Sequence, residues 1–329
     1  MAPTPRINLK NQAAEHYGNH RSGWAFAVHS LLPAHDERAT YLDTFVERTF
    51  VWDPPSAQAI REPWLGFVHV PPNVPRWFMA HQSNEAMFAT PAWQESLPHC
   101  RGLFTLSEYH RANLAPKVPV PVESLLHPTE DAALKWSPDA FARNPHKCVI
   151  QVGWWLRVLH GIFELPECGL HKVFLKARRE PFLDQLMAVE HEFRQRLGLF
   201  RPSMYASARI VDFVASSQYD QLLSHNIVFL NLYDTSANNA VIECIARQTP
   251  ILVNPLPAVV EYLGADYPLY YRGMIEAAEK ARNTDLLIKA HEHLAALHAK
   301  RPLSGERFRE TLVNSPLLAA ALSTPGNTP

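Results

Sequence analysis

Polar side chains interrupt an otherwise apolar segment between residues 235 and 264, TSANNAVIECIARQTPILVNPLPAVVEYLG. Ser236, Asn239 and Glu243 are spaced three and four residues apart, so on a helix they share a face that differs from the apolar one. With Ser236 as the N-cap, the free N–H groups of the first turn form a site for phosphate. A carboxylate further along can accept hydrogen bonds from both ribose hydroxyls. The spacing therefore predicts a nucleotide diphosphate along this helix, and the alternative is an amphipathic helix with one solvated Glu.

Such a helix needs a sheet to position it, and short apolar runs supply the strands. Strands are expected at RINLK, RTFVW, LGFVHV, GLFTLS and VPVESLL, and then at CVIQVGW, KVFLKA, ARIVDFV, NIVFLNL and PILVNP. Helices are expected at WAFAVHSLLP, at SEYHRANL with Ser107 as its cap, at EPFLDQLMAVEHEFRQRL, at SQYDQLLS, and throughout the tail from Met274 to Leu322. Strands that alternate twice with helices predict two α/β domains with mostly parallel sheets.

A polar stretch near residues 130 to 146 marks the seam between the two domains. We expect an N-terminal domain of residues 1–140 and a C-terminal domain of residues 141–275. Residues 276–329 are expected to form helices that pack back toward the first domain. Ligands of open α/β sheets bind outside the carboxyl ends of the strands, so two such domains would enclose the site in a cleft.

Composition excludes several classes of function. The chain has 329 residues, of which 47% are hydrophobic and 19% charged, as in globular proteins. Its formal net charge of −1 creates no field that favours nucleic acid or an anionic membrane. The N-terminal MAPTPRINLKNQ lacks the apolar core of a signal peptide. No apolar run reaches the roughly 18 residues of a membrane span, so we expect a cytoplasmic protein without a transmembrane segment.

The sequence contains no metal motif and no phosphate-loop motif. Its four cysteines lack CxxC spacing, its 17 histidines lack HExxH spacing, and no DxD-type motif is present. Cysteines of this kind are typical of reduced thiols in a cytosolic protein. With only 12 glycines the chain also lacks GxGxxG and Walker-type loops. We therefore expect neither a metal nor a cofactor.

Several segments, in their order along the chain, resemble GT-B glycosyltransferases, in particular the retaining family-four (group 1) kind. CVIQVGWWLRVLHG is similar to the family's strand, Gly and basic residue, VIECIARQTPILV to its helix with a ribose-binding Glu, and NPLPAVVEYLG to its small-residue turn before a Glu. More weakly, HYGNHRSGW resembles the Gly-rich loop, GFVHVPP the strand that ends in a His near the donor sugar, and GLFTLSEYHRANL a further strand and helix. The resemblance covers roughly residues 20 to 265.

The resemblance implies two Rossmann-like domains that face each other across a cleft, with C-terminal helices. It also implies transfer of a hexose-like sugar from a nucleotide diphosphate, which is a substrate and not a cofactor. The acceptor would be a carbohydrate, a lipid-linked molecule or a protein, held by the N-terminal domain. Retention of the anomeric configuration and independence of metal are implied with it.

Residues at the matching positions take roles by this resemblance. Arg157 and Lys176 would neutralise the diphosphate, and His69 would lie near the reacting centre. The donor would also be bound by Gly153, Ser236, Asn238, Asn239, Glu243, Glu261, Arg21 and Gly23. If the reaction inverts, His20 and Asp53 are the candidates for the base. Structural alternatives are an Arg stem packed on tryptophan, a solvated Lys, a core His and a Glu that suits a helix dipole.

Departures from the family's pattern leave other functions open. The position eight residues before Glu243, where the family often has a second Glu, is Thr235, with Asp234 one residue earlier. The Lys that usually accompanies the Arg is absent, and the family's Gly-Gly is replaced by Leu256, Pro257 and Ala258. The alternatives are a phosphorylase, an epimerase or a synthase on the same scaffold, and a non-catalytic protein that binds a nucleotide sugar.

Overall fold

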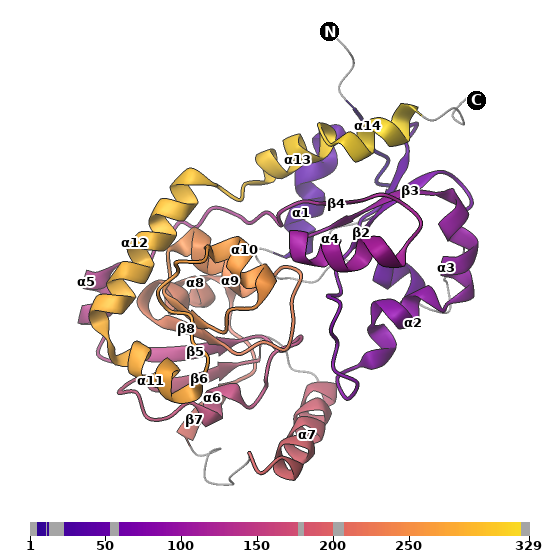
Figure 1. The fold of residues 1–329 in the computed structure, drawn as a ribbon. Helices are drawn as coiled ribbons and strands as arrows, with labels where there is room; N and C mark the ends of the chain where they lie inside the picture. Colours follow the sequence, from indigo (N-terminus) through magenta and orange to yellow (C-terminus); the bar gives the residue numbers. More distant parts are fainter. Residues whose placement is uncertain are drawn as a thin grey trace. The chain divides into compact units, whose positions relative to one another are not determined.

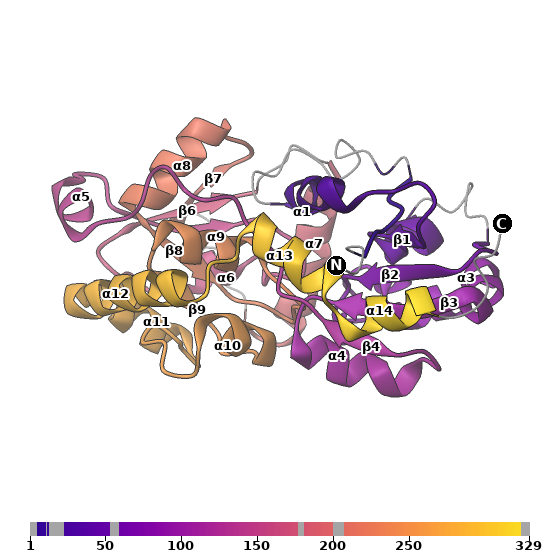
Figure 2. The same ribbon diagram turned by 90° about the horizontal axis from the view of Figure 1, so that it is seen from above.

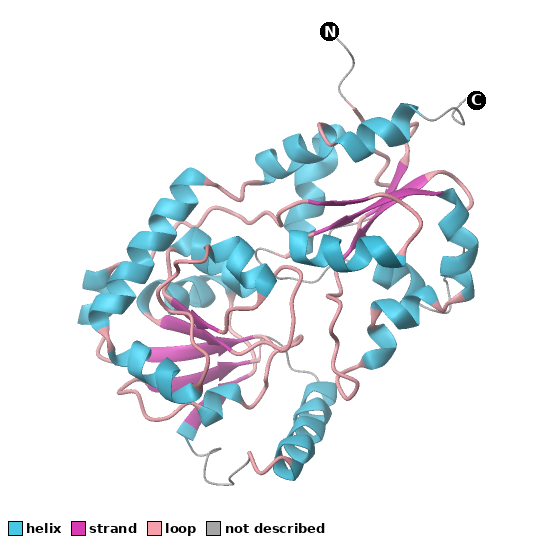
Figure 3. Ribbon diagram, in the orientation of Figure 1, coloured by secondary structure: helices cyan, strands magenta, loops and turns pink. Residues whose placement is uncertain are grey.

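The structure is a computed structural model that describes residues 5–10, 12, 23–52, 59–176, 181–199 and 207–323. The chain divides into two compact units, each with its own parallel sheet and covering helices (Figures 1 and 3). The first unit comprises Met1–Val74, Met79–Glu130 and Leu303–Pro329. The second unit comprises Pro75–Phe78 and Asp131–Pro302.

The first unit is built on a sheet with the strand order β1-β2-β3-β4, in which every neighbouring pair is parallel. The strands are β1 Tyr41–Asp43, β2 Trp64–Val68, β3 Cys100–Thr105 and β4 Val122–Ser124. The helices are α1 Trp24–Leu31, α2 Asn84–Phe88, α3 Pro91–Ser96, α4 Glu108–Leu114, α13 Gly305–Val313 and α14 Pro316–Ser323. The Ser107 side chain caps α4 by accepting from His110 N, so that predicted cap is confirmed.

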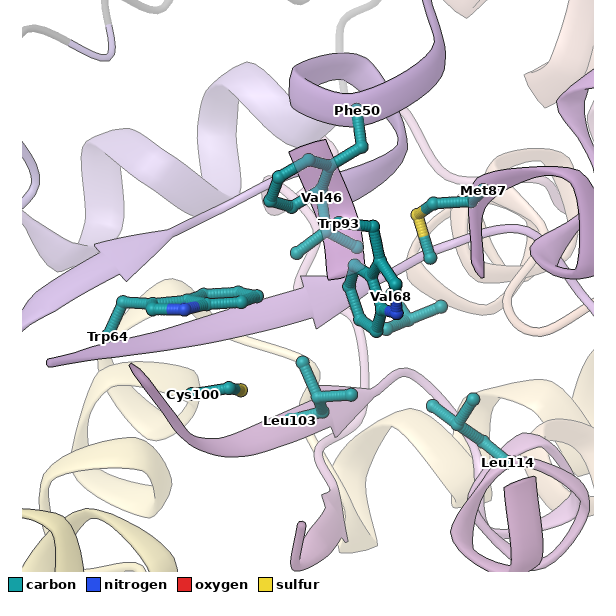
Figure 4. Close-up of a cluster of buried hydrophobic side chains, with 9 residues drawn as sticks. All are labelled: Val46, Phe50, Trp64, Val68, Met87, Trp93, Cys100, Leu103 and Leu114. Carbon is teal, nitrogen blue, oxygen red and sulfur yellow. The ribbon is translucent and has the colours of Figure 1, made fainter. Parts of the chain in front are cut away.

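A cluster of buried apolar side chains packs on this sheet (Figure 4). It comprises Val46, Phe50, Trp64, Val68, Met87, Trp93, Cys100, Leu103 and Leu114. The Trp64 and Trp93 rings meet edge to face at 6.1 Å, a favoured geometry for aromatic pairs. Gly66 has to be small, because a Cβ there would lie 2.5 Å from Val46 Cγ1. This packing fixes β2, the strand that leads directly to His69.

Two predicted strands of the first unit are wrong. RTFVW forms a π-helix, Arg48–Trp52, and RINLK forms only isolated bridges, while β1 lies outside the predicted strands. A run this short fits a strand and a helical turn equally well, so periodicity cannot separate them. Contact with the core decides, since Phe50 is 2% exposed on its helical turn and Trp52 is 37% exposed.

The second unit is built on a sheet with the strand order β7-β6-β5-β8-β9, again parallel throughout. The strands are β5 Cys148–Val152, β6 His171–Leu175, β7 Ala208–Val211, β8 Ile227–Leu230 and β9 Ile251–Val253. The helices are α5 Pro138–Arg143, α6 Gly161–Glu164, α7 Pro181–Arg196, α8 Ser216–His225, α9 Asn239–Arg247, α10 Pro257–Leu263, α11 Met274–Arg282 and α12 Thr284–Lys300. All five strands predicted for this part of the sequence are confirmed.

The strand order of the second sheet contains a topological switch point. From β5 the chain builds outward through β6 and β7, then crosses back to place β8 and β9 on the other side of β5. The chain segments that follow β5 and β8 therefore begin on adjacent strands and lead to strands on opposite sides of this pair. In doubly wound sheets this is where ligands bind. We name residues 153–160 the first loop and residues 231–238 the second loop.

The C-terminal helices, which the sequence predicts, are divided between the two units. Helices α11 and α12 belong to the second unit, and α13 and α14 to the first. Helix α13 packs on α1, where Phe308 meets Trp24 edge to face at 6.1 Å. Helix α14 lies beside β3 (Figure 2). The Leu317 side chain packs on Gly102 of that strand.

Burial of α9 generates a prediction about stability. Ile242 on α9 is 0% exposed, whereas Ile275, also a helical isoleucine, is 71% exposed. Ile242→Ala should lower the free energy of unfolding by about 2–5 kcal/mol, because it removes buried carbon and leaves a cavity. The matched control Ile275→Ala should change it by about 0.5 kcal/mol or less. Denaturant unfolding measures both, and equal losses in the two variants would contradict the burial of α9.

Candidate functional site

Gly153 opens the first loop, and two features require a glycine there. Its φ is +74°, in the left-handed region that residues with a Cβ rarely adopt. A Cβ would also lie 3.3 Å from three atoms of the Arg157 guanidinium group. The Gly153 N–H donates to Leu175 O at 2.9 Å, which ties the loop to the end of β6. Gly153 thus lets the Arg157 side chain fold back over its own loop.

The Arg157 guanidinium group is held by three acceptors. Nε donates to Val152 O at 2.9 Å, Nη1 to Trp155 O at 2.7 Å and Nη2 to Asn238 Oδ1 at 3.3 Å. Each terminal nitrogen carries two N–H groups, so one N–H on Nη1 and one on Nη2 donate to no described residue. Burial lowers the pKa of Arg157 to about 10, so the side chain stays cationic near neutral pH. The loop thus presents a fixed cation with a free donor on each terminal nitrogen.

Asn238, and not Ser236, caps α9. Its Oδ1 accepts from Ala240 N at 3.1 Å and from Val241 N at 3.4 Å. The predicted Ser236 cap is wrong because the helix begins two residues further on, and Ser236 is a buried residue of the second loop. Since Asn238 occupies two N–H groups of the first turn, the start of α9 leaves fewer donors for an anion than the sequence predicts.

The two loops pair with each other across the switch point. Val158 N donates to Asn231 O at 2.8 Å, and Tyr233 N donates to Leu156 O at 2.9 Å. These two bonds lie on either side of Arg157 in the sequence. Leu156 adopts a φ of +53° to make this pairing possible, a conformation that costs energy in a residue with a side chain.

Two amide side chains at strand ends hold the paired loops. Gln151 is fully buried, and its Oε1 accepts from Ile162 N at 2.9 Å while its Nε2 donates to Val158 O at 3.1 Å. Asn254 brackets the second loop: its Oδ1 accepts from Leu232 N at 2.8 Å and its Nδ2 donates to Leu232 O at 2.9 Å. Each amide satisfies backbone groups that would otherwise be left unpaired in a buried region.

Glu243 is buried on α9, with only 4% of its surface exposed. The alternative of a solvated Glu on an amphipathic helix is therefore wrong. Glu243 Oε2 accepts a hydrogen bond from the Tyr219 hydroxyl group of α8. Its other oxygen, Oε1, accepts no hydrogen bond from the described residues. The site thus holds an oriented carboxyl group with one acceptor oxygen to spare.

The electrostatic surroundings of Glu243 disfavour its charged form. Burial raises the pKa of the carboxyl group above its usual range, and Arg247, the Tyr219 hydrogen bond and Arg157 oppose that shift. Arg247 offsets only part of it, because its Nη2 is paired with Asp220 Oδ1 at 2.7 Å. A hydroxyl group that donated to Glu243 Oε1 would stabilise the carboxylate, and a hydrogen bond in such a low-dielectric place is strong.

Lys176 directly follows β6, beside the start of the first loop, but carboxylates already hold it. Its Nζ lies 2.6 Å from Asp184 Oδ1 and 3.6 Å from Asp212 Oδ1. The Lys176 side chain is 11% exposed, whereas that of Asp184 is 69% exposed. An anion that used Lys176 would have to share it with these carboxylates or displace them, and the exposed Asp184 is the easier to displace.

The structure brings only some of the predicted residues together. Gly153, Arg157 and Asn238 converge at the switch point, and Asn239 follows as the first residue of α9. Glu261 lies within α10, which begins at Pro257, and it is half-buried. The backbone carbonyl of Glu261 accepts from Arg301 Nη2 at 3.1 Å, which ties α10 to the residue that follows α12.

His69, in the first unit, is a neutral and tightly held histidine. Its Nε2 donates to Thr44 O at 2.9 Å, and its ring stacks on Phe45 at 3.9 Å. The backbone N–H of His69 donates to Glu47 Oε1 at 2.7 Å. Burial lowers the pKa of His69 to about 3, so the ring is uncharged near neutral pH. With the proton on Nε2, Nδ1 is left as an acceptor and makes no hydrogen bond to a described residue.

Of the remaining predicted residues, the structure describes only Gly23, directly before α1. Gly23 is buried and occupies the N-cap position of α1 without a side-chain cap bond. The preceding Arg21 and His20, and also Asp53, lie outside the described residues. Within the described ranges, no three or more His, Cys, Asp or Glu residues are placed to hold a metal ion. A search of the same ranges finds no helix that is both long enough and apolar enough to cross a membrane.

Sequence reasoning missed Tyr219, Tyr233 and Glu190. In the sequence, Tyr219 has no feature that separates it from other residues of an amphipathic helix, and Tyr233 none that separates it from other residues of a turn after a strand. Glu190 gave a signal, because α7 has buried residues at Leu183, Leu186 and Met187, and the same helical spacing continues at Glu190. A charged residue in a buried row needs partners inside the protein.

The arrangement in the second unit can bind a ligand with an anion and hydroxyl groups. Arg157 offers paired N–H donors, a geometry that suits carboxylate or phosphate oxygens. Glu243 offers an acceptor oxygen for a hydroxyl group. Both residues are on loops or helices that flank the switch point, where such ligands bind in doubly wound sheets.

Comparison with known proteins supports the fold. No protein-family model matches the chain, and no curated protein matches it either. Among solved structures, the chain is similar to sucrose-phosphate synthase from Thermosynechococcus elongatus, with a TM-score of 0.58 and 14% identity over 88% of this chain and 75% of that chain. It is also similar to a UDP-forming α,α-trehalose-phosphate synthase from Burkholderia vietnamiensis, with a TM-score of 0.53 and 12% identity over 84% of this chain and 72% of that one.

A third similar structure is TarM from S. aureus in complex with UDP, α-GlcNAc-glycerol and fondaparinux. The TM-score is 0.55 at 12% identity, over 77% of this chain and 51% of that chain. The chain thus spans about half the length of TarM. These likenesses show the GT-B fold, α/β with two Rossmann-like domains, that the sequence resemblance implied.

The raised pKa of Glu243 leads to a prediction about stability and pH. A carboxyl group with a raised pKa binds its proton more tightly in the folded state, so it destabilises the fold at high pH and stops doing so as pH falls through that pKa. Glu243→Gln has no such charge. Its melting temperature should equal or exceed that of the wild type at pH 8, and any advantage should shrink at pH 5.

The control for this prediction is Glu192→Gln on the exposed side of α7, which should leave the melting temperature unchanged at both pH values. Thermal unfolding followed by circular dichroism measures all three proteins. A clearly lower melting temperature for Glu243→Gln at pH 8 would show that the bonds to the carboxylate outweigh the cost of burying it.

Proposed function

We propose that this chain is a glycosyltransferase that transfers a hexose-like sugar from a nucleotide diphosphate to an acceptor. The observation that carries the proposal is the half-buried Arg157 guanidinium group at the switch point, with a free N–H on each terminal nitrogen and Asn238 beside it. The likeness in fold to a UDP-forming synthase and to a UDP complex supports a nucleotide-sugar donor. The acceptor would be a carbohydrate, a lipid-linked molecule or a protein.

Arg157 would bind the diphosphate through its two free N–H groups, as a guanidinium group does with two phosphate oxygens. When the bond to the sugar breaks, negative charge develops on the departing diphosphate. A fixed cation in a partly buried site stabilises that charge without having to reorganise, which is often the largest catalytic contribution. Lys176 would add a second cation after releasing Asp184. These ligands need no metal ion, so we propose a metal-independent reaction.

Glu243 would hold the ribose, and the remaining donor-side residues would complete the site. Its Oε1 is the acceptor for a ribose hydroxyl group, while Tyr219 holds Oε2 and so fixes the direction of the carboxyl group. Ser236 and Asn239 would contact the phosphates or the sugar from the second loop and the start of α9. Glu261 would accept from sugar hydroxyls.

The proposal includes retention of the anomeric configuration, a route that requires no protein base. The state of His69 fits this route, because an imidazole whose pKa is about 3 is a poor base and serves instead as a neutral hydrogen-bonding group. An inverting route would need another base, and the sequence offers His20 and Asp53 for it.

One observation favours a second function, the binding of a nucleotide sugar without catalysis. The family's first carboxylate is absent at Thr235, and the neighbouring Asp234 is only 3% exposed. Asp234 Oδ1 accepts from Thr235 N at 2.8 Å, so this carboxylate serves the loop and is not presented to a sugar. Slow hydrolysis of the donor by the purified protein would decide against this alternative.

Calorimetric titration with UDP, GDP and their glucose conjugates tests the function. At least one of these nucleotides should bind, and binding should persist in EDTA, because the proposed phosphate ligands are N–H groups and not a metal. Glu243→Gln should weaken binding about tenfold, through the loss of one charge-assisted hydrogen bond to ribose. The control Glu192→Gln should bind like the wild type. Absence of binding to any nucleotide, or strict dependence on Mg²⁺, would overturn the proposal.

Replacement of Arg157 tests its role in catalysis. Arg157→Ala should lower kcat/KM for donor turnover by about two orders of magnitude, as the loss of one stabilising donor usually does. Arg157→Lys keeps the positive charge but loses the paired N–H donors of the guanidinium group. Its kcat/KM should therefore lie between those of the wild type and Arg157→Ala. The control is Arg61→Ala, an arginine whose side chain is 76% exposed, which should turn over normally. Normal turnover by Arg157→Ala would show that this arginine only shapes its loop.

A further inference from the structure

Glu190 on α7 is a buried carboxylate that the proposed reaction does not use. It is 0% exposed. Its Oε1 accepts from Leu159 N at 3.0 Å and from the Tyr233 hydroxyl group at 2.6 Å. Its Oε2 accepts from His160 N at 2.9 Å and from His160 Nδ1 at 2.5 Å. Each oxygen therefore accepts two hydrogen bonds, which fills the acceptor capacity of the group.

The partners of Glu190 come from the two loops at the switch point. Leu159 and His160 end the first loop, which carries Gly153 and Arg157, while Tyr233 belongs to the second loop, which ends at Asn238. Glu190 itself is on a third element, since α7 follows β6. One carboxylate thus connects both loops to α7.

His160 explains why the chain needs this carboxylate. By the sequence resemblance, a lysine is expected near this position, where it would point toward the phosphates. Here the imidazole turns inward, and its Nδ1 donates to Glu190. The first loop therefore gains an internal anchor at its end in place of a second cation, and Arg157 becomes the cation that this loop presents.

We propose that Glu190 is a positioning residue that fixes the distance between the two loops, and thereby the diphosphate site formed by Arg157 and Asn238. This inference rests on the proposed function. Burying a carboxylate is costly unless its charge is satisfied, so Glu190 stabilises only the arrangement in which both loops deliver their donors. A shift of either loop would leave part of the charge unpaired, which restrains the loops before the ligand arrives.

A purely structural role makes a different prediction. The neighbouring ion pair on the same helix, Arg194 with Glu164, is also largely buried, and Glu164 belongs to α6 and not to either loop. If Glu190 only stabilises α7, its loss should resemble the loss of Glu164 and should weaken all ligands equally. If Glu190 positions the loops, its loss should weaken only the part of the binding affinity that the phosphates contribute.

The test compares Tyr233→Phe and Glu190→Gln with the matched control Glu164→Gln. Tyr233→Phe removes one of the bonds to Glu190 and keeps the ring that meets Trp77 edge to face at 5.3 Å, so it should fold. Calorimetry measures the affinity for UDP or GDP, whichever the wild type binds, and for the matching nucleoside. We expect Tyr233→Phe and Glu190→Gln to bind the nucleoside diphosphate about tenfold more weakly than the wild type does. Their affinity for the nucleoside should stay within about twofold of the wild-type value.

Hydrogen–deuterium exchange of the free proteins supplies the second measurement. In Tyr233→Phe, exchange should rise in residues 153–160 and 231–238 and stay unchanged in α12. Equal loss of diphosphate and nucleoside affinity, no loss at all, or the same phosphate-specific loss in Glu164→Gln would overturn the proposal. If the wild type binds no nucleotide, the proposed function fails, and unchanged exchange in the two loops would then separately show that Glu190 does not hold them.

Discussion

The half-buried positive charge of Arg157 is the constraint on which the second unit's site depends. A guanidinium group partly removed from water needs acceptors, and here Val152 O at the end of β5, Trp155 O in the first loop and the Asn238 side chain supply them. For these acceptors to converge, residue 153 has to be Gly and Leu156 has to adopt a positive φ. The cap of α9 then follows, because the Asn238 oxygen that meets Arg157 also meets the first turn of that helix.

The same logic extends to the other charged groups near the switch point, each of which has an internal partner. Lys176 is paired with Asp184, and Glu243 with Tyr219. A ligand at this site would therefore exchange partners and would not fill unpaired charges. Exchange reduces the net gain on binding, but it leaves the free protein without the cost of orphaned buried charge. The exposed Asp184 is the partner that is easiest to exchange, whereas Glu243 Oε1 and the free N–H groups of Arg157 would bind a ligand without exchange.

Much of this could be predicted from the sequence, for physical reasons. The strands of the second sheet are short apolar runs between helical patterns, and buried parallel strands such as β5, β8 and β9 have that signature. The fold and the position of Gly153 and Arg157 after a strand followed directly. The first unit was harder to predict, because Phe50 reaches the core from a helical turn, which has the same short apolar pattern as a strand.

The hydrogen-bond partners of the site residues could not be predicted, in contrast to their positions on strands, helices and loops. The sequence shows that Glu190 continues a buried row of α7, but its donors lie 30, 31 and 43 residues away, and only the folded topology brings them to it. The same holds for the cap of α9, where Ser236 and Asn238 are both good capping residues. Arg157, 81 residues earlier, favours Asn238, because its Nη2 donates to the Asn238 side-chain oxygen at 3.3 Å. Local propensity supplied two candidates, and a long-range hydrogen bond from a charged group favours one of them.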